Sequence, residues 1–185
     1  MCTVYGYCRI STAKQSIERQ IRNIRAAYPD ATIIEEVFTR TSLNRDRWLK
    51  LYTKVKEGDT IVFDSVSRMS GNAAEGYKAY EELYARGVSL VFLKEPHINT
   101  DTYKQAMERQ ICASVDSGDA DTDELIKGIT EAINRYTMRL AERQIKLAFE
   151  QSEKEVQDLH QRTKEGIETA RLNGKQIGAV PGRKL

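Results

Sequence analysis

The chain has 185 residues, of which 30% are charged and 40% apolar, and its formal net charge is +2. This composition suits a protein that buries one core, and the length allows one domain with an appendage. No apolar run approaches the roughly 20 residues that span a bilayer, which excludes a transmembrane helix. The three cysteines lack the spacing of a disulfide framework or a zinc site. With no signal peptide before the first expected strand, the sequence predicts a cytoplasmic protein with reduced thiols.

Strand and helix patterns alternate over about the first half of the chain. Runs of β-branched and aromatic residues predict strands, and apolar residues three or four apart predict the helices between them. The expected strands are Val4–Cys8, Ala31–Phe38, Thr60–Asp64 and Val88–Leu93, and the expected helices are Ser16–Tyr28, Asn44–Lys56 and Asn72–Arg86. This order predicts an α/β fold whose mainly parallel, four- to five-stranded sheet is flanked by helices.

After Pro96 the strand patterns stop. A helix is expected over Asp101–Ala113, and a second, proline-free helical pattern runs from about Thr122 to Asn173. One helix of that length would extend about 75 Å at 1.5 Å per residue, further than an α/β domain of about 100 residues is wide. We therefore expect this helix to mediate oligomerisation by packing on another chain. A break near Gln144–Gln151, giving two helices, is the alternative, and it leaves the same expectation of oligomerisation.

These patterns divide the chain into an α/β domain over 1–118, a long helix over 119–173 and a basic linker over 174–185. From Arg171 to Leu185 the chain carries cations and no acids, which is typical of a polyanion-binding segment but also of a solvated chain end. The linker leads to no further element in this sequence. We therefore expect it to connect to a C-terminal module that the sequence does not contain.

Three segments with polar residues lie at or near the carboxyl ends of the expected strands. Arg9 and Ser11 follow the first strand, Arg45 opens the second helix, and Ser67 and Arg68 follow the third strand. The carboxyl ends of parallel strands meet at one edge of a sheet, so these side chains should gather there. Arginine binds phosphate oxygens bidentately and keeps its charge. The sequence therefore predicts a serine hydroxyl among guanidinium groups that could attack a phosphodiester without a metal.

Each of these residues also has a structural interpretation. Ser11 could cap the first helix, Arg45 could be a surface cation beside Asp46, and Arg68 could pair with Asp64 to hold a loop. No glycine-rich phosphate loop occurs, and the two histidines lie far apart without the context of a hydrolase triad. Only the conjunction of the three segments favours a catalytic site.

With these residues in view, the chain resembles the serine recombinase superfamily, the resolvase/invertase group of site-specific DNA recombinases. The resemblance spans residues 4–175, with an expansion around 104–148. It rests on three motifs in order: Tyr7-Cys8-Arg9-Ile10-Ser11-Thr12 with Gln15 and Gln20; Glu57-Gly58-Asp59 followed by Ser67-Arg68-Met69-Ser70; and Glu155 with Arg162-Thr163-Lys164-Glu165-Gly166.

The resemblance implies that residues 1–118 form the catalytic domain and that Ser11 is the nucleophile, which becomes esterified to a DNA 5′ phosphate. It implies that Arg9, Arg45 and Arg68 bind and activate the scissile phosphate. The supporting residues would be Tyr7, Gln15, Gln20, Ser67 and Glu155, and the DNA-binding residues would be Arg162, Lys164, Arg171 and Lys175. The implied partners are double-stranded DNA and further copies of the chain, as a homodimer that becomes a tetramer during strand exchange. The long helix would form the dimer interface, its end would cross the minor groove, and no cofactor, metal or membrane would take part. The module after the linker would be a helix-turn-helix.

The chain departs from the family pattern at three places. Gly71 stands where a second arginine usually follows Arg68, Thr39-Arg40 stand where an acid is usual, and Ser67 replaces the common aspartate. Removing one charge donor from a transition state costs about 3–4 kcal/mol, so Gly71 should slow the reaction. A non-catalytic, DNA-associated oligomerisation protein is therefore the alternative function. A small phosphohydrolase on a flavodoxin-like sheet is a third, which the long helix disfavours.

Overall fold

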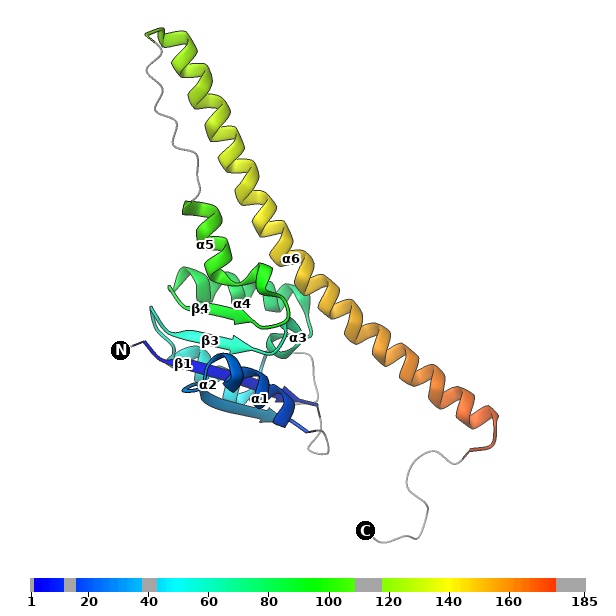
Figure 1. Ribbon diagram of the computed structural model, residues 1–185. Coiled ribbons are helices and arrows are strands. Elements are labelled where there is room, and N and C mark those ends of the chain that lie inside the picture. Colours follow the sequence, from blue (N-terminus) through cyan, green and yellow to red (C-terminus); the bar gives the residue numbers. More distant parts are fainter. Residues whose placement is uncertain (1, 12–15, 38–42, 109–117, 176–185) are drawn as a thin grey trace.

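A single four-stranded sheet, parallel throughout, forms the centre of the protein in the computed structural model, which describes residues 2–11, 16–37, 43–108 and 118–175 (Figure 1). The strands lie in the order β2-β1-β3-β4, with β1 Val4–Ile10, β2 Thr32–Val37, β3 Thr60–Phe63 and β4 Ser89–Phe92. This confirms the expected α/β fold. Strand β1 continues two residues beyond the expected Cys8, because Arg9 and Ile10 still pair with Glu36 and Val37 of β2.

The helices follow the expected order, with boundaries that differ by a few residues. They are α1 Glu18–Ala27, α2 Asp46–Lys54, α3 Val66–Met69, α4 Ala73–Ala85, the 3-10 helix η1 Pro96–Ile98, α5 Thr100–Glu108 and α6 Ala120–Leu172. Helices α3 and η1 were not expected, since their four and three residues are too short for an apolar period to show. The end of the helix expected over Asp101–Ala113 lies outside the described residues.

The two faces of the sheet bury separate cores because side chains alternate along each strand. Tyr5 and Tyr7 of β1 point to the larger core, where the Tyr7 ring packs edge-on against Trp48 of α2 at 5.3 Å between ring centroids. Cys8 points to the smaller core, where it meets Ile24 of α1. Arg9 has the same parity as Tyr7. The alternation of β1 therefore delivers a charged side chain to the edge of the larger core.

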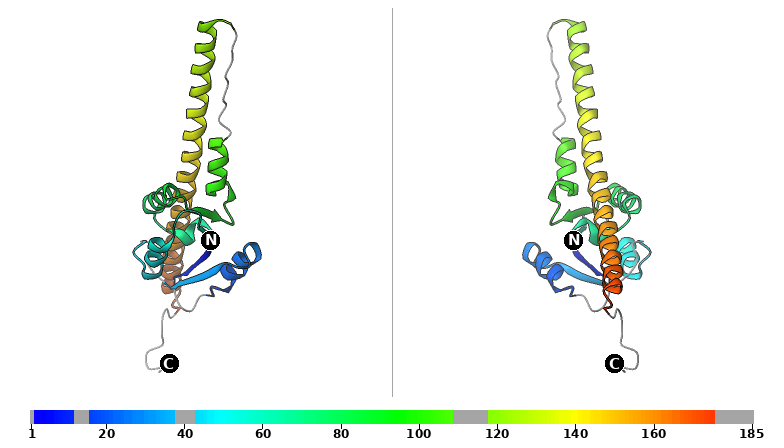
Figure 2. Two further views of the ribbon diagram at one scale, coloured as in Figure 1. Left: turned by 90° about the vertical axis from the view of Figure 1, so that its left-hand side faces the viewer. Right: turned by 90° about the vertical axis from the view of Figure 1, so that its right-hand side faces the viewer.

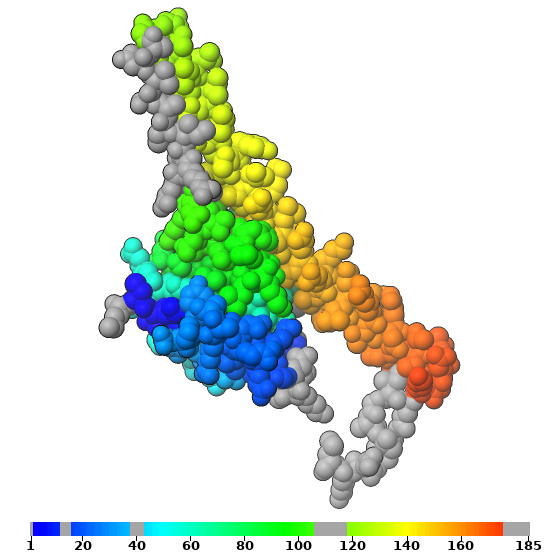
Figure 3. Space-filling model, viewed as in Figure 1, coloured from blue at the N-terminus to red at the C-terminus, as the bar shows by residue number. Residues whose placement is uncertain are grey.

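Helix α6 is one continuous helix of 53 residues, about 80 Å long at 1.5 Å per residue. The expected single helix is therefore confirmed, and the alternative, a break near Gln144–Gln151, is wrong. Figures 1 and 3 show α6 crossing the α/β domain and extending beyond it at both ends, and Figure 2 shows its N-terminal part standing clear of the domain. Its buried residues all come from the stretch that crosses the domain: Ile145, Ala148, Phe149 and Ser152. In the part of the chain that the structure describes, no helix combines the length and the apolar character needed to cross a membrane.

The contact between α6 and α4 depends on a glycine. The Phe149 ring lies so close to Gly76 that a Cβ at residue 76 would come within 2.6 Å of two ring carbons and within 2.9 Å of the Ser70 Cβ. Phe149 also packs edge-on against Tyr80 and Phe92. An aromatic ring at the centre of a packed core cannot move without disturbing its neighbours. The absence of a side chain at Gly76 therefore allows the two helices to approach this closely.

We predict that Gly76→Ala destabilises the protein although alanine is the better helix former. Overpacking costs about 1–3 kcal/mol, whereas the gain in helix propensity is at most about 1 kcal/mol. Urea unfolding should therefore give a lower free energy of unfolding. The matched control is Gly128→Ala in α6, where a Cβ meets nothing within 4 Å, and which should not lower that free energy. Equal effects of the two substitutions would contradict this account of the helix contact.

Candidate active site

The site begins with Arg45, the residue before α2, which is 1% exposed. Its guanidinium donates to the Tyr7 hydroxyl at 2.9 Å through Nη1 and to the Met69 carbonyl at 2.7 Å through Nη2. The Tyr7 hydroxyl in turn donates to Glu36 at 3.2 Å. Arg45 is therefore no surface cation beside Asp46. It is tied to β1, and through Tyr7 to β2, and to the end of α3.

Glu36 completes this arrangement from β2 and is 6% exposed. Besides Tyr7, its carboxylate accepts from the backbone amides of Trp48 at 2.9 Å and Arg47 at 3.4 Å, both in the first turn of α2. A carboxylate is favourable there because the first amides of a helix lack intrahelical acceptors. Glu36 thus fixes the start of α2 and, with it, the place of Arg45.

Arg9 and Arg68 are the other two members of the cluster. Arg9, 9% exposed, donates through Nη2 to the Ser67 carbonyl at 2.7 Å, and the half-buried Arg68 donates through Nη1 to the Arg9 carbonyl at 3.0 Å. Gln20 of α1 binds both backbone groups of Arg9, accepting from its amide at 3.0 Å and donating to its carbonyl at 2.9 Å. The end of β1 is therefore held by α1 on one side and α3 on the other.

Crowding of buried cations perturbs this site. Burial, and then the nearby charges of Arg45 and Arg68, lower the pKa of Arg9 to about 10. Burial also lowers the pKa of Arg68, against the opposing field of Asp64. Burial raises the pKa of Tyr7 to about 12, so its hydroxyl keeps the proton that it donates to Glu36. A bound anion would relieve the repulsion among the guanidinium groups.

Ser11 lies exposed one residue beyond β1 and two residues after Arg9. It does not cap α1, whose N-cap is Ile17. Asp64, the proposed structural partner of Arg68, forms its ion pairs with Arg19 at 3.5 Å and Lys94 at 3.4 Å. The interpretations of Ser11 as a helix cap and of Arg68 as a partner of Asp64 are therefore not supported. Gln15 lies outside the described residues, as do Thr39 and Arg40.

A polar cavity of about 310 Å³ lies between α3, the segment after β4, and α6. It brings Ser67 and Arg68 together with Glu155 of α6. Two polar atoms at this cavity, Arg68 Nε and Ser152 Oγ, are buried and have no hydrogen-bond partner among the described residues. Glu155 thus lies on the α6 side of the same cavity as Arg68.

The residues expected to bind DNA are not part of this cluster. Arg162, Lys164 and Arg171 lie exposed on the last turns of α6, and Lys175 lies exposed just beyond its end. Arg171 forms an ion pair at 4.0 Å with Glu168, but such exposed pairs are weak and leave the cation available. The structure therefore separates these cations from the arginine cluster along the helix.

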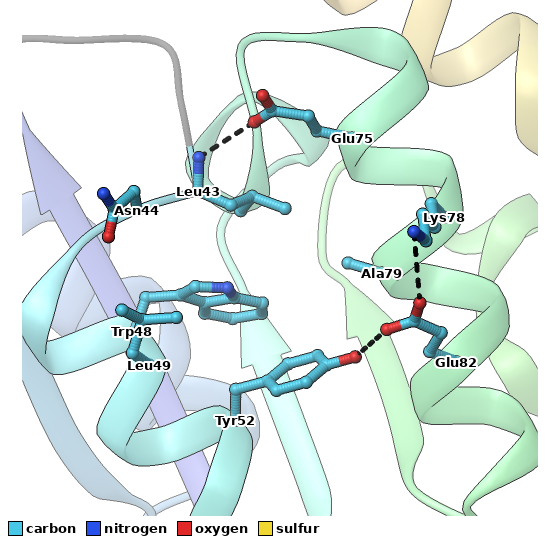
Figure 4. A pocket seen from close by; sticks show the side chains of 9 residues that line it. All are labelled: Leu43, Asn44, Trp48, Leu49, Tyr52, Glu75, Lys78, Ala79 and Glu82. Atoms are coloured by element: carbon cyan, nitrogen blue, oxygen red, sulfur yellow. Dashed lines mark hydrogen bonds and ion pairs between the residues drawn. The ribbon is translucent and has the colours of Figure 1, made fainter.

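A second hollow, of about 400 Å³, lies between α2 and α4 (Figure 4). Trp48 and Tyr52 line it from α2. Its polar groups already bind one another: Tyr52 and Lys78 both contact Glu82, and Glu75 accepts from the Leu43 amide at 3.0 Å. Because its one cation is paired, this hollow is a poor phosphate site. No group of three or more potential metal ligands clusters within the described ranges.

Sequence reasoning missed Glu36. It lies directly beside Arg9 in the register of β1 and β2, and a buried acid in a strand needs such a neighbour. The signal was available, since two adjacent acids interrupt an otherwise apolar strand. Without the register there was no means of deciding which of Glu35 and Glu36 faces the core.

The family profile and the related sequences that match this chain are all described as resolvases. The sequence profile described as "Resolvase, N terminal domain" matches residues 4–176. A resolvase of Clostridium perfringens is 24% identical over 174 residues, covering 94% of this chain and 74% of that protein. The Transposon Tn3 resolvase of Escherichia coli is 32% identical over 99 residues, 53% of each chain. The chain thus matches about half the length of that resolvase. A resolvase-family site-specific recombinase from Streptococcus pneumoniae, a crystal structure, aligns over 92% of this chain and 99% of that one, with a TM-score of 0.42 and 20% identity.

We predict that Glu36→Ala destabilises the protein strongly. The substitution leaves the Tyr7 hydroxyl and the Trp48 amide without their acceptor, and each buried unsatisfied donor costs about 1–3 kcal/mol. The free energy of unfolding in urea should fall by about 2 kcal/mol or more. The neighbouring Glu35→Ala removes an exposed carboxylate and should change it by about 0.5 kcal/mol or less. A loss for Glu35 as large as that for Glu36 would show that Glu36 does not hold the cluster.

Proposed function

This chain belongs to the family described as Resolvase, N terminal domain, and we propose that it is a site-specific DNA recombinase that cleaves and rejoins strands through Ser11. The observation that carries the proposal is the gathering of Arg9, Arg45 and Arg68 at the end of β1, the strand that the exposed Ser11 directly follows. Gathering two buried guanidinium groups and a half-buried one is unfavourable, and an anion bound among them would offset that cost. A backbone phosphate of DNA is the anion that the family membership suggests.

In the proposed reaction, the Ser11 Oγ attacks the scissile phosphorus, and the bond between phosphorus and the 3′ oxygen breaks. The products are a 5′-phosphoserine ester and a free 3′ hydroxyl, which later attacks the ester and restores the serine. Arg9, Arg45 and Arg68 stabilise the charge on the non-bridging oxygens, which is most of what a protein does in phosphoryl transfer. Gln20, Tyr7 and Ser67 support these arginines through the contacts described above, and Gln15 and Glu155 are proposed to assist them. Because the ester conserves the bond energy, the reaction needs no ATP.

We also propose that α6 joins two copies of the chain. Ahead of the stretch buried on the domain, apolar side chains recur three or four residues apart and remain exposed: Leu125, Ile129, Ile133, Tyr136 and Leu140. Such a stripe is typical of a helix that packs on another helix. We propose a homodimer, and a tetramer during strand exchange, in which this stripe is covered.

The opposite end of α6 is the proposed DNA arm. Arg162, Lys164, Arg171 and Lys175 lie beyond the domain, where they could reach the phosphates on either side of a minor groove. In the proposed division of the chain, residues 1–118 carry the chemistry, 119–173 form the dimer and DNA arm, and 174–185 form a basic linker. We propose that the chain acts in the cytoplasm, where DNA is accessible.

The test is a trapped protein–DNA adduct. The full chain is incubated with a randomised pool of nicked duplexes, denatured in detergent, and examined for covalently bound DNA, with the linkage mapped by mass spectrometry. We expect an adduct at Ser11 that Ser11→Ala abolishes. The matched control Ser16→Ala, a nearby exposed serine, should retain it. Absence of any adduct, with DNA still bound, would favour the non-catalytic oligomerisation protein instead.

A second arm of this assay addresses Gly71. We propose that the missing arginine slows cleavage, because one lost charge donor costs about 10²–10³-fold in rate. The φ angle of Gly71 is not positive, so an L-residue can adopt its backbone conformation. Gly71→Arg should therefore speed adduct formation. Because Gly71 is buried, the variant's free energy of unfolding in urea is measured as well, and an unchanged rate in a variant of unchanged stability would contradict the proposal.

A further inference from the structure

Two of the three arginines are held by the backbone of one short segment, Val66–Ala73. Its Ser67 carbonyl accepts from Arg9 and its Met69 carbonyl accepts from Arg45, each at 2.7 Å. The third arginine, Arg68, belongs to the segment itself. Any displacement of this segment therefore moves all three cations of the candidate site.

The segment is fixed at both ends by carboxylates from distant parts of the chain. At its start, the Val66 amide donates to Glu95 Oε2 at 3.1 Å. At its end, the Ala73 amide, the first of α4, donates to Glu153 Oε2 at 3.0 Å. Between these points, Ser70 Oγ donates to the Asn72 carbonyl at 2.9 Å and accepts from the Asn72 amide at 3.1 Å. The turn after Met69 is thus a compact unit that ends on the Glu153 carboxylate.

Glu153 differs from Glu95 because it belongs to α6. It lies one helical turn after Phe149, on the same face, so the packing of Phe149 against Gly76 determines where the Glu153 carboxylate lies. Ala148 and Ser152 are buried in the same stretch of α6, where it packs on the domain. The position of α6 on the domain is therefore transmitted by one hydrogen bond to the segment that holds the arginines.

Two side chains cap the start of α4, and they accept from different backbone amides. Asn72 caps that helix by accepting from the Glu75 amide at 2.9 Å. The Glu153 carboxylate accepts from a second donor, the Ala73 amide, so this bond joins α6 both to the start of α4 and to the end of the segment that holds the arginines.

We propose that Glu153 is a positioning residue: by binding the Ala73 amide it fixes segment Val66–Ala73, and through the Met69 carbonyl it sets the place of Arg45. The proposal rests on the proposed function, in which Arg45 binds the scissile phosphate. Glu153 itself touches no DNA in this scheme.

The experiment compares Glu153→Ala with Glu153→Gln, whose amide oxygen can still accept from Ala73. The control is Glu150→Ala, an exposed acid one turn earlier on α6 that forms no hydrogen bond or ion pair with the described residues. Two quantities are measured on the full chain: the rate of the Ser11 adduct at saturating DNA, and the Nε–H signal of Arg45 in ¹H–¹⁵N NMR spectra without DNA. The two measurements separate this proposal from the proposed function, because the second requires no reaction.

We expect Glu153→Ala to slow adduct formation about tenfold, the effect of one charge-assisted hydrogen bond, and to shift the Arg45 signal. DNA affinity should change by less than about twofold, since the residue does not contact DNA. Glu153→Gln should restore most of the rate and the signal, and Glu150→Ala should match the unaltered chain. If the unaltered chain forms no adduct, the proposed function fails. The Arg45 signal alone then shows whether Glu153 sets the position of Arg45.

Three outcomes would overturn the proposal. The first is an Arg45 signal that Glu153→Ala leaves unchanged. The second is a glutamine variant as impaired as the alanine variant. The third is an equal loss of rate in Glu150→Ala, which would show a general effect of altering α6.

Discussion

The burial of guanidinium groups at the end of a parallel sheet is the constraint on which the rest of this structure depends. Arg45 is 1% exposed and Arg9 9% exposed, and burial lowers the pKa of Arg9 to about 10. Burying such charges is costly, and hydrogen bonds to the guanidinium groups offset part of that cost. Here the acceptors are the carbonyls of Ser67 and Met69 and the hydroxyl of Tyr7, which itself donates to Glu36. All of these acceptors belong to the protein, and donors held in place by the protein are what electrostatic stabilisation of a transition state requires.

The same acceptors explain why distant elements matter to the site. The carbonyls that hold Arg9 and Arg45 belong to a segment whose ends bind Glu95 and Glu153. One of these acids lies on α6, the helix proposed to join two copies of the chain. Helix α6 is 53 residues long and is buried only where it crosses the domain, so two different parts of it can have two different roles. It binds the end of the segment that holds the arginines, and its exposed apolar stripe is the surface on which we propose that a second copy packs.

Much of this could be predicted from the sequence, for identifiable reasons. The sheet follows from runs of β-branched residues, and the single long helix follows from an apolar pattern without proline. Arg9, Arg45 and Arg68 converge because parallel strands end at one edge. Helices α3 and η1 were missed because periodicity needs more than one turn. Glu36 was missed because strand register decides which of two adjacent acids is buried, and Glu153 because its bond to Ala73 joins residues 80 positions apart. Tertiary packing settles those contacts, and no local pattern encodes them.

The central claim, that the arginines form a site already arranged for a phosphate, can be tested by titrating the Arg9 side chain. Its ¹³Cζ signal, assigned with Arg9→Lys, is followed against pH with and without sulfate, whose charge does not change over that range. Without sulfate the account predicts a midpoint near the lowered pKa of about 10. With sulfate the midpoint should rise towards the ordinary value for arginine, because an anion offsets both the burial and the charges of Arg45 and Arg68. A midpoint that sulfate leaves unchanged would contradict the account.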